Sequence, residues 1–271
     1  MSARIACVQM ASGADVAANL AAAGAALEQA RARGAAVAVL PENFAFMGAH
    51  ERDKLAVGEE VGSGPIQDFL AGASRRLGLW IVAGTIPLKT REPDRVAAAC
   101  LAISAEGECV ARYDKIHLFD VDVPGGQSYR ESASIAPGAL DCVVVETPAG
   151  RIGLSVCYDL RFPELFRGLV AAGAEILAVP SAFTARTGEA HWETLLRARA
   201  IENQCYVAAP GQVGTHPGGR TTWGHSVVVD PWGRILEQCA DGAGVIVADV
   251  PREPLLQLRR SFPALSHRRI Q

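Results

Sequence analysis

Cys157 lies in surroundings that suit a nucleophile. It stands in the stretch GLSVCYDLRFPEL, between the apolar, β-branched run RIGLSV and apolar residues spaced as on one helix face (162, 165, 166, 169 and 170). Cys157 is therefore expected at a strand-to-helix turn. Pro163 suits the first helical position, and the amides and positive dipole end of that helix would favour the thiolate. The alternative is a core thiol, because free cysteine is among the most buried residue types.

A thiol nucleophile also needs a proton acceptor, a group that stabilises the oxyanion and an acid for the leaving group. Glu42 in VAVLPENF could act as base and acid if burial raises its pKa, Lys115 in ARYDKIHLF could stabilise an oxyanion, and Glu131 in SYRES could add a second carboxylate. Each also has a structural interpretation. Glu42 would stabilise the first turn of a helix, and Glu131 would be an ordinary loop residue. Lys115 would lie at the surface and pair with Asp114 or another acid.

Three histidines could partner a catalytic cysteine. His117 follows Lys115 by two residues and would share its side of an extended strand. His191 is expected at the start of a helix, and His225 lies in TTWGHSVVV. Their spacing is not typical of a metal site, so capping or core packing is the alternative for each.

The sequence carries no motif for a metal or a nucleotide cofactor. HWETL differs from the zinc-binding HExxH at its last position, VCYDLRF places its arginine too early for a CxxxxxR phosphatase loop, and no GxGxxG or GxxxxGK follows a predicted strand. The seven cysteines form no CxxC pair, which argues against a zinc site and a disulfide scaffold. We therefore expect no metal and no cofactor. HPGGRTTWG is expected to be a flexible turn.

The composition is that of a globular protein with a large core. Of the 271 residues, 49% are hydrophobic and 20% are charged, and the net charge is −3. The scattered basic residues give no footprint for nucleic acid, and no window holds about eighteen uninterrupted apolar residues. The N-terminus lacks a secretory pattern, and the cysteines are expected to be reduced. These features predict a cytoplasmic protein that binds neither nucleic acid nor membrane.

Short apolar strands alternate with helical patterns, which predicts an α/β fold whose helices cover two apolar sheet faces. Hairpins around Glu106–Gly107 and around Ala149–Gly150 indicate a mixed sheet, and GHSVVVDPWGRILEQC is expected to pair with GVIVADV. No linker interrupts the pattern, so a single domain over residues 1–271 is expected. The residues 118–137 are expected to form a functional or mobile loop. Strands are expected at RIACVQM, AAVAVLPE, LWIVAGTIPL, AEILAVPSAF and QCYVAAPGQV, and helices at about 15–33, from Pro65 to a stop at Gly78, after Cys157 and at about 189–203.

Three segments together resemble the signature segments of the nitrilase superfamily of carbon-nitrogen hydrolases. They are LPENF with Glu42, RYDKIHLFD with Lys115 and GLSVCYDLRFPEL with Cys157, in the family's order and spacing. The likeness extends over nearly the whole chain. The segments PSAFTARTGEAHWETLLRARAIENQCYV and GHSVVVDPWGRIL and the tail LRR…HRR resemble the Nit branch, which in some animals is fused to Fhit.

This resemblance implies a four-layer α-β-β-α sandwich that forms a homodimer or a higher homo-oligomer. The basic C-terminal tail, about 252–271, would contact the partner; the alternative is a solvated tail. Glu42 would be the general base, Lys115 would stabilise the tetrahedral intermediate, and Cys157 would be the nucleophile. Glu131 would help to orient the site, and the backbone amide of Tyr158 would complete the oxyanion hole. The family requires no metal or organic cofactor.

The implied reaction is hydrolysis of a primary amide through a cysteine thioester, with Glu42 protonating ammonia and then activating water. The main prediction for the substrate is deaminated glutathione, the α-keto form of glutathione, giving 2-oxoglutarate, cysteinylglycine and ammonia; PSAF and AIENQCYVAA favour it. FDVDVPG favours the sister branch, ω-amidase, which acts on 2-oxoglutaramate. Further alternatives are hydrolysis of a nitrile or an N-carbamoyl compound, and a non-catalytic role as a dimeric interaction module.

Arginines could bind the carboxylates of such a substrate, because a guanidinium can hold a carboxylate through two hydrogen bonds. Arg161 and Arg186 are the candidates, since they follow the nucleophile and the next strand end. Phe183, Thr184 and His191 are expected beside them. Either arginine could instead form a structural ion pair.

Overall fold

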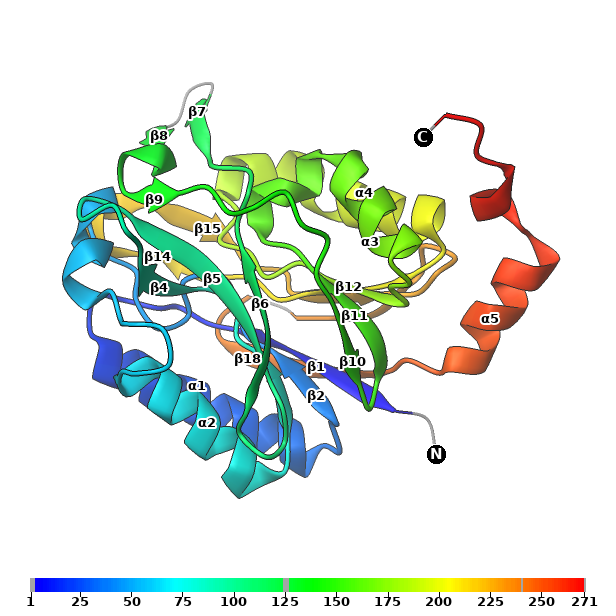
Figure 1. Cartoon of the computed structure of the whole chain (residues 1–271), viewed down its shortest axis with the longest axis horizontal. Helices are drawn as coiled ribbons and strands as arrows, with labels where there is room; N and C mark the ends of the chain where they lie inside the picture. The colour runs from blue at the N-terminus through cyan, green and yellow to red at the C-terminus, as the bar shows by residue number, and fades with distance from the viewer. Residues whose placement is uncertain (1–2, 124–126, 240, 271) are drawn as a thin grey trace.

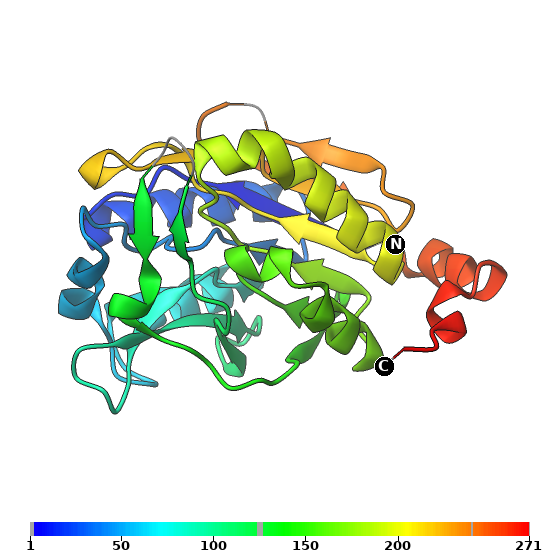
Figure 2. The ribbon, with the colours of Figure 1, turned by 90° about the horizontal axis from the view of Figure 1, so that it is seen from above.

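Two β-sheets lie face to face, and helices cover the outer face of each sheet (Figure 1). The predicted four-layer α-β-β-α sandwich is confirmed. α1 (Val16–Ala32) and α2 (Pro65–Leu77) cover the first sheet, and α3 (Pro163–Ala171) and α4 (Ala185–Asn203) cover the second. Figure 2 shows α4 lying along the strands of the second sheet. The computed structural model describes residues 3–123, 127–239 and 241–270.

The first sheet combines parallel and antiparallel strands. Its order is β18 (Gly244–Asp249), β1 (Arg4–Gln9), β2 (Val37–Val39), β3 (Trp80–Val82), β5 (Val96–Ile103) and β4 (Ile86–Lys89), and β6 (Cys109–Asp114) and β9 (Ile135–Ala136) also pair with β5. β1, β2 and β3 are parallel neighbours, whereas β18, β4 and β6 pair in the antiparallel sense. The predicted mixed sheet is confirmed, and so is the hairpin around Glu106–Gly107.

The second sheet has a parallel centre and antiparallel edges. Its order is β10 (Val144–Thr147), β11 (Gly150–Leu154), β12 (Ile176–Ala178), β13 (Tyr206–Ala209), β16 (Val227–Val229) and β17 (Ile235–Gln238). β11, β12 and β13 are parallel, and the predicted hairpin around Ala149–Gly150 is the antiparallel pair β10–β11. The segment GHSVVVDPWGRILEQC forms its own hairpin, β16–β17, whereas GVIVADV contains β18 and pairs with β1 in the first sheet, so the predicted pairing of the two segments is wrong. Two short hairpins lie outside both sheets: β7 (Asp120–Asp122) with β8 (Ser128–Arg130), and β14 (Val213–Thr215) with β15 (Thr221–Trp223).

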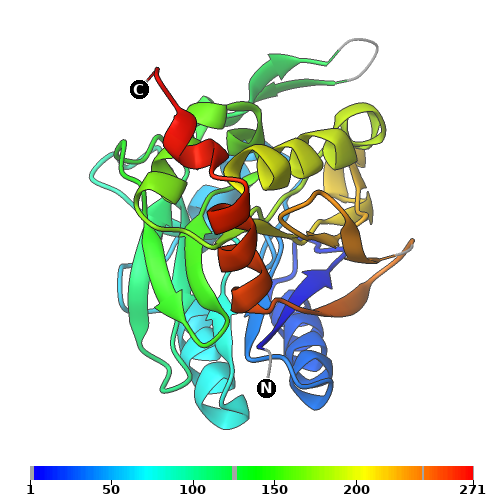
Figure 3. The ribbon, with the colours of Figure 1, turned by 90° about the vertical axis from the view of Figure 1, so that its right-hand side faces the viewer.

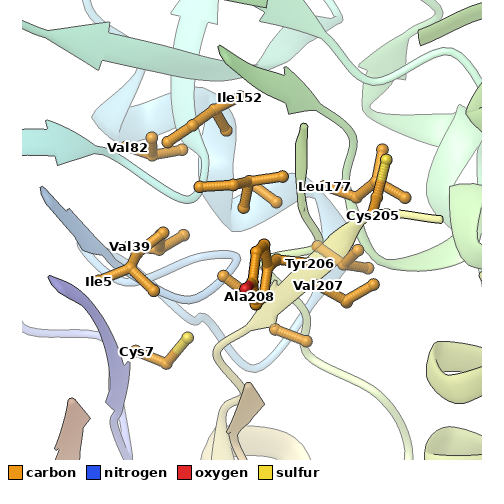
Figure 4. Packing of buried hydrophobic residues seen from close by; sticks show 14 of the residues in the cluster. Ile5, Cys7, Val39, Val82, Ile152, Leu177, Cys205, Tyr206, Val207 and Ala208 are labelled. Carbon is orange, nitrogen blue, oxygen red and sulfur yellow. The ribbon is translucent and has the colours of Figure 1, made fainter. Parts of the chain in front are cut away.

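Alternate side chains of the central strands fill the spaces between the layers. In β1, Ile5 and Cys7 belong to the apolar cluster between the sheets, whereas Ala6 and Val8 pack with the helices on the outer face. Figure 4 shows Ile5 and Cys7 among side chains from both sheets, including Ile152. A strand that is buried on both faces has a continuous apolar sequence, which is why RIACVQM reads as a strand.

The segment LWIVAGTIPL forms two strands instead of the single strand predicted. β3 and β4 both pair with β5 and are separated by a bend at Gly84, whose φ is +51°. A Cβ at this position would lie 1.9 Å from the carbonyl oxygen of Pro41. After the bend, Thr85 Oγ1 accepts a hydrogen bond from Asn43 N at 2.9 Å. The bend therefore packs directly against the chain on either side of Glu42.

Helix α4 begins at Ala185, four residues before the predicted start at about Glu189. Thr187 and Gly188 are weak helix formers, which is why the pattern suggested a later start. The close packing of α4 on β15 explains the difference, because a Cβ on Gly188 would lie 2.3 Å from Cβ of Trp223. His191 consequently lies in the second turn of α4 and does not open the helix.

The described parts of the stretch 118–137, residues 118–123 and 127–137, contain regular elements instead of the predicted irregular loop. It contains the β7–β8 hairpin, a 3₁₀ turn at Glu131–Ala133 and β9, which pairs with β5. This pairing anchors the segment that carries Glu131. The FDVDVPG match continues into residues 124–126, which lie outside the described residues.

The C-terminal helix α5 (Arg252–Ser261) and the 3₁₀ turn Ala264–His267 lie along one end of the sandwich (Figure 3). Leu255 anchors the helix in the core, and Tyr206 Oη donates a hydrogen bond to Pro251 O at 2.9 Å. Across the described ranges, no helix has both the length and the apolar character needed to span a bilayer.

Candidate active site

The structure brings Glu42, Lys115, Glu131 and Cys157 to one small cavity of about 20 Å³. Glu42 follows β2, Lys115 follows β6, Glu131 follows β8, and Cys157 follows β11. The cavity is thus built by segments that leave both sheets. Its other lining residues are Asn43, Glu51, Phe119, Tyr158, Ala182, Phe183, Thr184, Thr187 and Arg220.

Lys115 is the central charge of the cavity and is only 1% exposed. Its Nζ lies 2.8 Å from Glu42 Oε1 and 2.8 Å from Glu131 Oε2. Burial lowers the pKa of the ammonium, but the carboxylates of Glu131 and Glu42 outweigh burial and raise it well above its usual value. The alternative of a surface pair with Asp114 is wrong, because Asp114 pairs with Arg112 at 2.8 Å.

Glu42 is buried with both carboxylate oxygens occupied. Oε2 accepts a hydrogen bond from Ala182 N at 2.8 Å, and Oε1 faces Lys115. Burial raises the pKa of this carboxyl, but Lys115 and, more weakly, Arg220 outweigh burial and lower it to about 2. The expected raised pKa is therefore wrong, because the cations dominate. The alternative of a first-turn glutamate is also wrong, because Glu42 lies in a turn and not in a helix.

Cys157 opens a 3₁₀ turn, Cys157–Arg161, with an unusual φ of +46°. Its backbone amide donates to Pro180 O at 2.9 Å, and its thiol lies beside the Glu42 carboxylate in the cavity. Burial raises the pKa of the thiol, and the Glu42 carboxylate raises it further against the opposing effect of Lys115. The helix begins at Pro163 as predicted, but the expected preference for the thiolate is wrong, because burial and the Glu42 carboxylate raise the pKa of the thiol.

Asp159 supports the turn and was not singled out from the sequence. It is fully buried, and its Oδ2 accepts hydrogen bonds from Val156 N and Tyr113 Oη, each at 2.7 Å. Oδ1 lies 2.7 Å from Nδ1 of His117, whose ring stacks on Phe162. Asp159 therefore ties the Cys157 turn to the segment that carries Lys115. His117 belongs to this support and does not line the cavity.

The other predicted histidines also lie outside the cavity lining. His225 Nδ1 is 2.8 Å from Trp223 O, and its ring stacks on that tryptophan. His191 Nδ1 is 3.4 Å from Arg161 Nη2. In the described part of the chain, the group next to the Cys157 thiol is thus a carboxylate and not an imidazole.

The predicted substrate-binding residues divide into two groups. Phe183 and Thr184 line the cavity itself. Arg161 does not line the cavity, but its guanidinium carbon lies 5.3 Å from the ring centroid of Phe183, which does. Arg186 lines a neighbouring cavity of about 140 Å³ that shares Thr184 with the first.

Arg220 is a cavity residue that sequence reasoning missed. It lies in HPGGRTTWG, which forms the turn and second strand of the β14–β15 hairpin and not the flexible turn predicted. The hairpin is anchored because Gly218, with φ +74°, packs where a Cβ would lie 2.4 Å from Ala49 O. The β-branched and aromatic residues Thr221, Thr222 and Trp223 favour a strand and could have indicated one. No local pattern indicates that Arg220 faces Glu42.

The chain matches known proteins over nearly its full length. The family model for carbon-nitrogen hydrolase matches residues 4–260. The deaminated glutathione amidase of Yersinia enterocolitica is 44% identical over 270 residues, which cover 99% of this chain and 93% of that protein. The human deaminated glutathione amidase is 44% identical over 246 residues, covering 90% of this chain and 75% of the human protein.

Solved structures agree with this relationship. The crystal structure of the Caenorhabditis elegans NitFhit protein superposes with a TM-score of 0.91 at 38% identity, covering 99% of this chain and 66% of that one. Saccharomyces cerevisiae Nit3, described as a member of branch 10 of the nitrilase superfamily, has a TM-score of 0.88 at 29% identity, with 99% and 97% coverage. This chain belongs to the carbon-nitrogen hydrolase family of the nitrilase superfamily.

Proposed function

We propose that this carbon-nitrogen hydrolase is an amidase that cleaves deaminated glutathione into 2-oxoglutarate and cysteinylglycine. The names of the bacterial and human relatives support the choice of substrate. The observation that carries the proposed chemistry is the contact of the Cys157 thiol with Glu42, whose other oxygen faces the buried Lys115 at 2.8 Å. A complete set of groups of this kind also argues against a non-catalytic interaction module.

Glu42 would act as the general base in the first step. Because the pKa of the thiol is raised and that of Glu42 is lowered, the resting proton stays on Cys157. The proton therefore moves to Glu42 only as sulphur attacks the amide carbonyl. Lys115 and the amide of Tyr158 would stabilise the oxyanion of the tetrahedral intermediate, and Glu131 would hold Lys115 in place.

Glu42 would then act as an acid. Collapse of the intermediate breaks the carbon–nitrogen bond, and the proton that Glu42 took from the thiol passes to the departing amine. The products of this half-reaction are an acyl thioester on Cys157 and the free amine. In the second half, ionised Glu42 takes a proton from water as the water oxygen attacks the thioester carbonyl. Collapse of this second tetrahedral intermediate breaks the carbon–sulphur bond and releases the acid, and Glu42 passes the proton to the departing sulphur, which restores the thiol.

The release of ammonia predicted for this substrate is wrong on atom balance. Hydrolysis of one amide bond gives one acid and one amine, and 2-oxoglutarate and cysteinylglycine already account for both. The cleaved bond is a secondary amide, and the leaving amine is the amino group of cysteinylglycine. Ammonia is the leaving group only for a primary amide such as 2-oxoglutaramate.

The second candidate substrate is 2-oxoglutaramate, whose amine half is only ammonia and therefore needs no space beyond the catalytic cavity. Both substrates yield 2-oxoglutarate, so its formation measures both on one scale. Purified protein should show the higher kcat/KM with deaminated glutathione. A higher value with 2-oxoglutaramate would assign the protein to the ω-amidase function. Hydrolysis of neither would overturn both assignments and leave nitriles and N-carbamoyl compounds, recognised by nitrile consumption or carbon dioxide release.

Cys157→Ala tests the mechanism in the same assay. It should abolish 2-oxoglutarate formation, whereas the matched control Cys109→Ala, at an exposed thiol, should retain it. Mass spectrometry of wild type quenched during turnover should detect the oxo-acyl adduct on the peptide with Cys157. Activity in Cys157→Ala, or an adduct on a different residue, would contradict the thioester mechanism.

We also propose that the protein forms a homodimer through its C-terminal segment and is located in the cytoplasm. Phe262 and Ile270 are 58% and 87% exposed, which suits a contact with a partner. All seven cysteines are unpaired, as is usual in reducing compartments. Light scattering should give twice the chain mass, and Phe262→Glu should lower it. A monomeric mass at micromolar concentration would contradict the dimer, and cell fractionation tests the location.

A further inference from the structure

A second cavity of about 230 Å³ opens beside the catalytic one. We call it the entrance cavity. The two cavities adjoin, because Asn43, Glu51 and Arg220 line both, and a substrate that fills both would pass along these residues. The remaining lining residues of the entrance cavity are Met47, Gly48, Ala49, His50, Lys54, Gln127, Ser128, Tyr129, Pro217 and Gly218.

We infer that the entrance cavity binds the amine half of a peptide-like substrate, and that Arg220 and Lys54 bind the terminal carboxylate of that half. This inference rests on the proposed function and adds the residues that distinguish the two candidate substrates. The amine half of deaminated glutathione is a dipeptide that ends in a carboxylate. The amine half of 2-oxoglutaramate is only ammonia, which leaves the entrance cavity empty.

The direction of the substrate follows from the position of the acid. The leaving nitrogen must lie at Glu42, which returns the proton to it. Asn43, next in the chain, lines both cavities, and Arg220 is close enough to Glu42 to affect the pKa of its carboxyl. The amine half therefore extends from Glu42 toward the entrance cavity. The acyl half would face the part of the catalytic cavity that the entrance cavity does not share, which includes Phe183 and Thr184.

Arg220 is held ready for an anion. Its Nη2 donates to Ala182 O at 2.8 Å, and its guanidinium carbon lies 5.1 Å from the Tyr129 ring centroid. Its Nε is buried without a hydrogen-bond partner, and no ion pair among the described residues includes Arg220. An unpaired guanidinium at a cavity wall attracts an anion, so a carboxylate supplied by a ligand is favoured at this place.

Lys54 gives the entrance cavity an excess of positive charge. It lies in the 3₁₀ helix Glu51–Val57, and its Nζ is 3.4 Å from Glu51 Oε2. Among the cavity's lining residues, Glu51 is the acidic one, and Lys54 and Arg220 are basic, with His50 counted as neutral. A substrate carboxylate would balance the remaining positive charge.

The test compares deaminated glutathione with its C-terminal carboxamide, which is identical except for the missing charge. Wild type should prefer the acid, measured as the ratio of the two kcat/KM values. Arg220→Gln should lower this ratio about tenfold, and Lys54→Gln about threefold, because each removes one partner of the carboxylate. Any effect on Glu42 or on folding changes both substrates alike and leaves the ratio unchanged.

Lys89→Gln is the matched control, because Lys89 is exposed and pairs with Glu60. Its ratio should equal that of wild type. Ratios in Arg220→Gln and Lys54→Gln that match wild type, in enzyme that still cleaves the acid, would overturn the inference and leave the proposed function intact. Failure of wild type to cleave the acid would overturn the proposed function and the inference with it.

Discussion

Two buried thiols in this protein differ in what surrounds them. Cys7 lies between the sheets with no exposed surface, and its nearest polar partner is Val227 O at 3.9 Å. Cys157 is 6% exposed, contacts Glu42 and lines a cavity. Burial raises the pKa of both thiols. Burial and pKa therefore fail to separate a core cysteine from a nucleophile, whereas an adjacent base and space for a substrate do.

Of the two thiols, Cys157 has a base beside it, and removing that base, Glu42, is expected to have the largest effect. Glu42→Gln should lower kcat about 10³-fold to 10⁴-fold, because neither the thiol nor the attacking water then has a proton acceptor. Initial rates of 2-oxoglutarate formation measure this loss. Glu28→Gln, in an exposed pair with Arg76, should keep wild-type rates. A Glu42→Gln variant within tenfold of wild type would mean that another group takes the thiol proton.

Asp159→Asn tests the support beneath the nucleophile. An amide accepts at only one of its two polar ends, so the variant should lose the hydrogen bonds either with Val156 N and Tyr113 or with His117, and thereby misplace Cys157. We expect kcat to fall about 10-fold to 100-fold with little change in KM. Tyr113→Phe, which removes a single hydrogen bond, should lose less. Equal kcat values for wild type and Asp159→Asn would show that the turn holds its geometry without this carboxylate.

The pH dependence of stability should also reveal the Glu42 environment. The pKa of its carboxyl is about 2 in the folded protein against an ordinary value of 4.5. A lowered pKa stabilises the fold above pH 4.5, and this stabilisation is lost as the pH falls from 4.5 toward 2. Urea unfolding over this interval should show a loss of up to about 3 kcal/mol that is missing in Glu42→Gln. Parallel curves for the two proteins would contradict the lowered pKa.

The smallest effect on activity is expected at the core thiol. Cys7→Ala removes a buried sulphur from the space between the sheets and should lower the free energy of unfolding by about 1 kcal/mol. kcat and KM should remain at wild-type values, since Cys7 does not line either cavity. A changed kcat would show that the core between the sheets is coupled to the site.

Local patterns were sufficient to predict most elements of the fold. Asp15 caps α1 by accepting from Ala18 N, Gly78 ends α2 with φ +56°, and Pro163 opens α3. These features depend on neighbours within a few residues, which is why periodicity and capping signals reveal them. The prediction of a single strand for LWIVAGTIPL is wrong because the segment bends at Gly84. That bend packs against Pro41, a contact across the fold that no local pattern indicates.

Most residues of the site could be predicted from the sequence, but the effect of their charges on one another could not. Glu42 and Lys115 are 73 residues apart, so no local pattern indicates that they form an ion pair. Without that contact, burial alone suggested a raised pKa for Glu42, the opposite of what the structure gives. Arg220 was missed for the same reason, because its role depends on how the β14–β15 hairpin packs and not on its sequence neighbours.

Gly84 should tolerate few substitutions, although it takes no part in the chemistry. Glycine carries no functional group, and Gly84 does not line the catalytic cavity, yet any side chain there would collide with the backbone just before Glu42. A substitution would have to displace either β4 or the base. In a screen of all substitutions, position 84 should therefore tolerate as few replacements as a reacting residue. The reason is that Gly84 has no side chain, and the backbone before Glu42 occupies the place where one would lie.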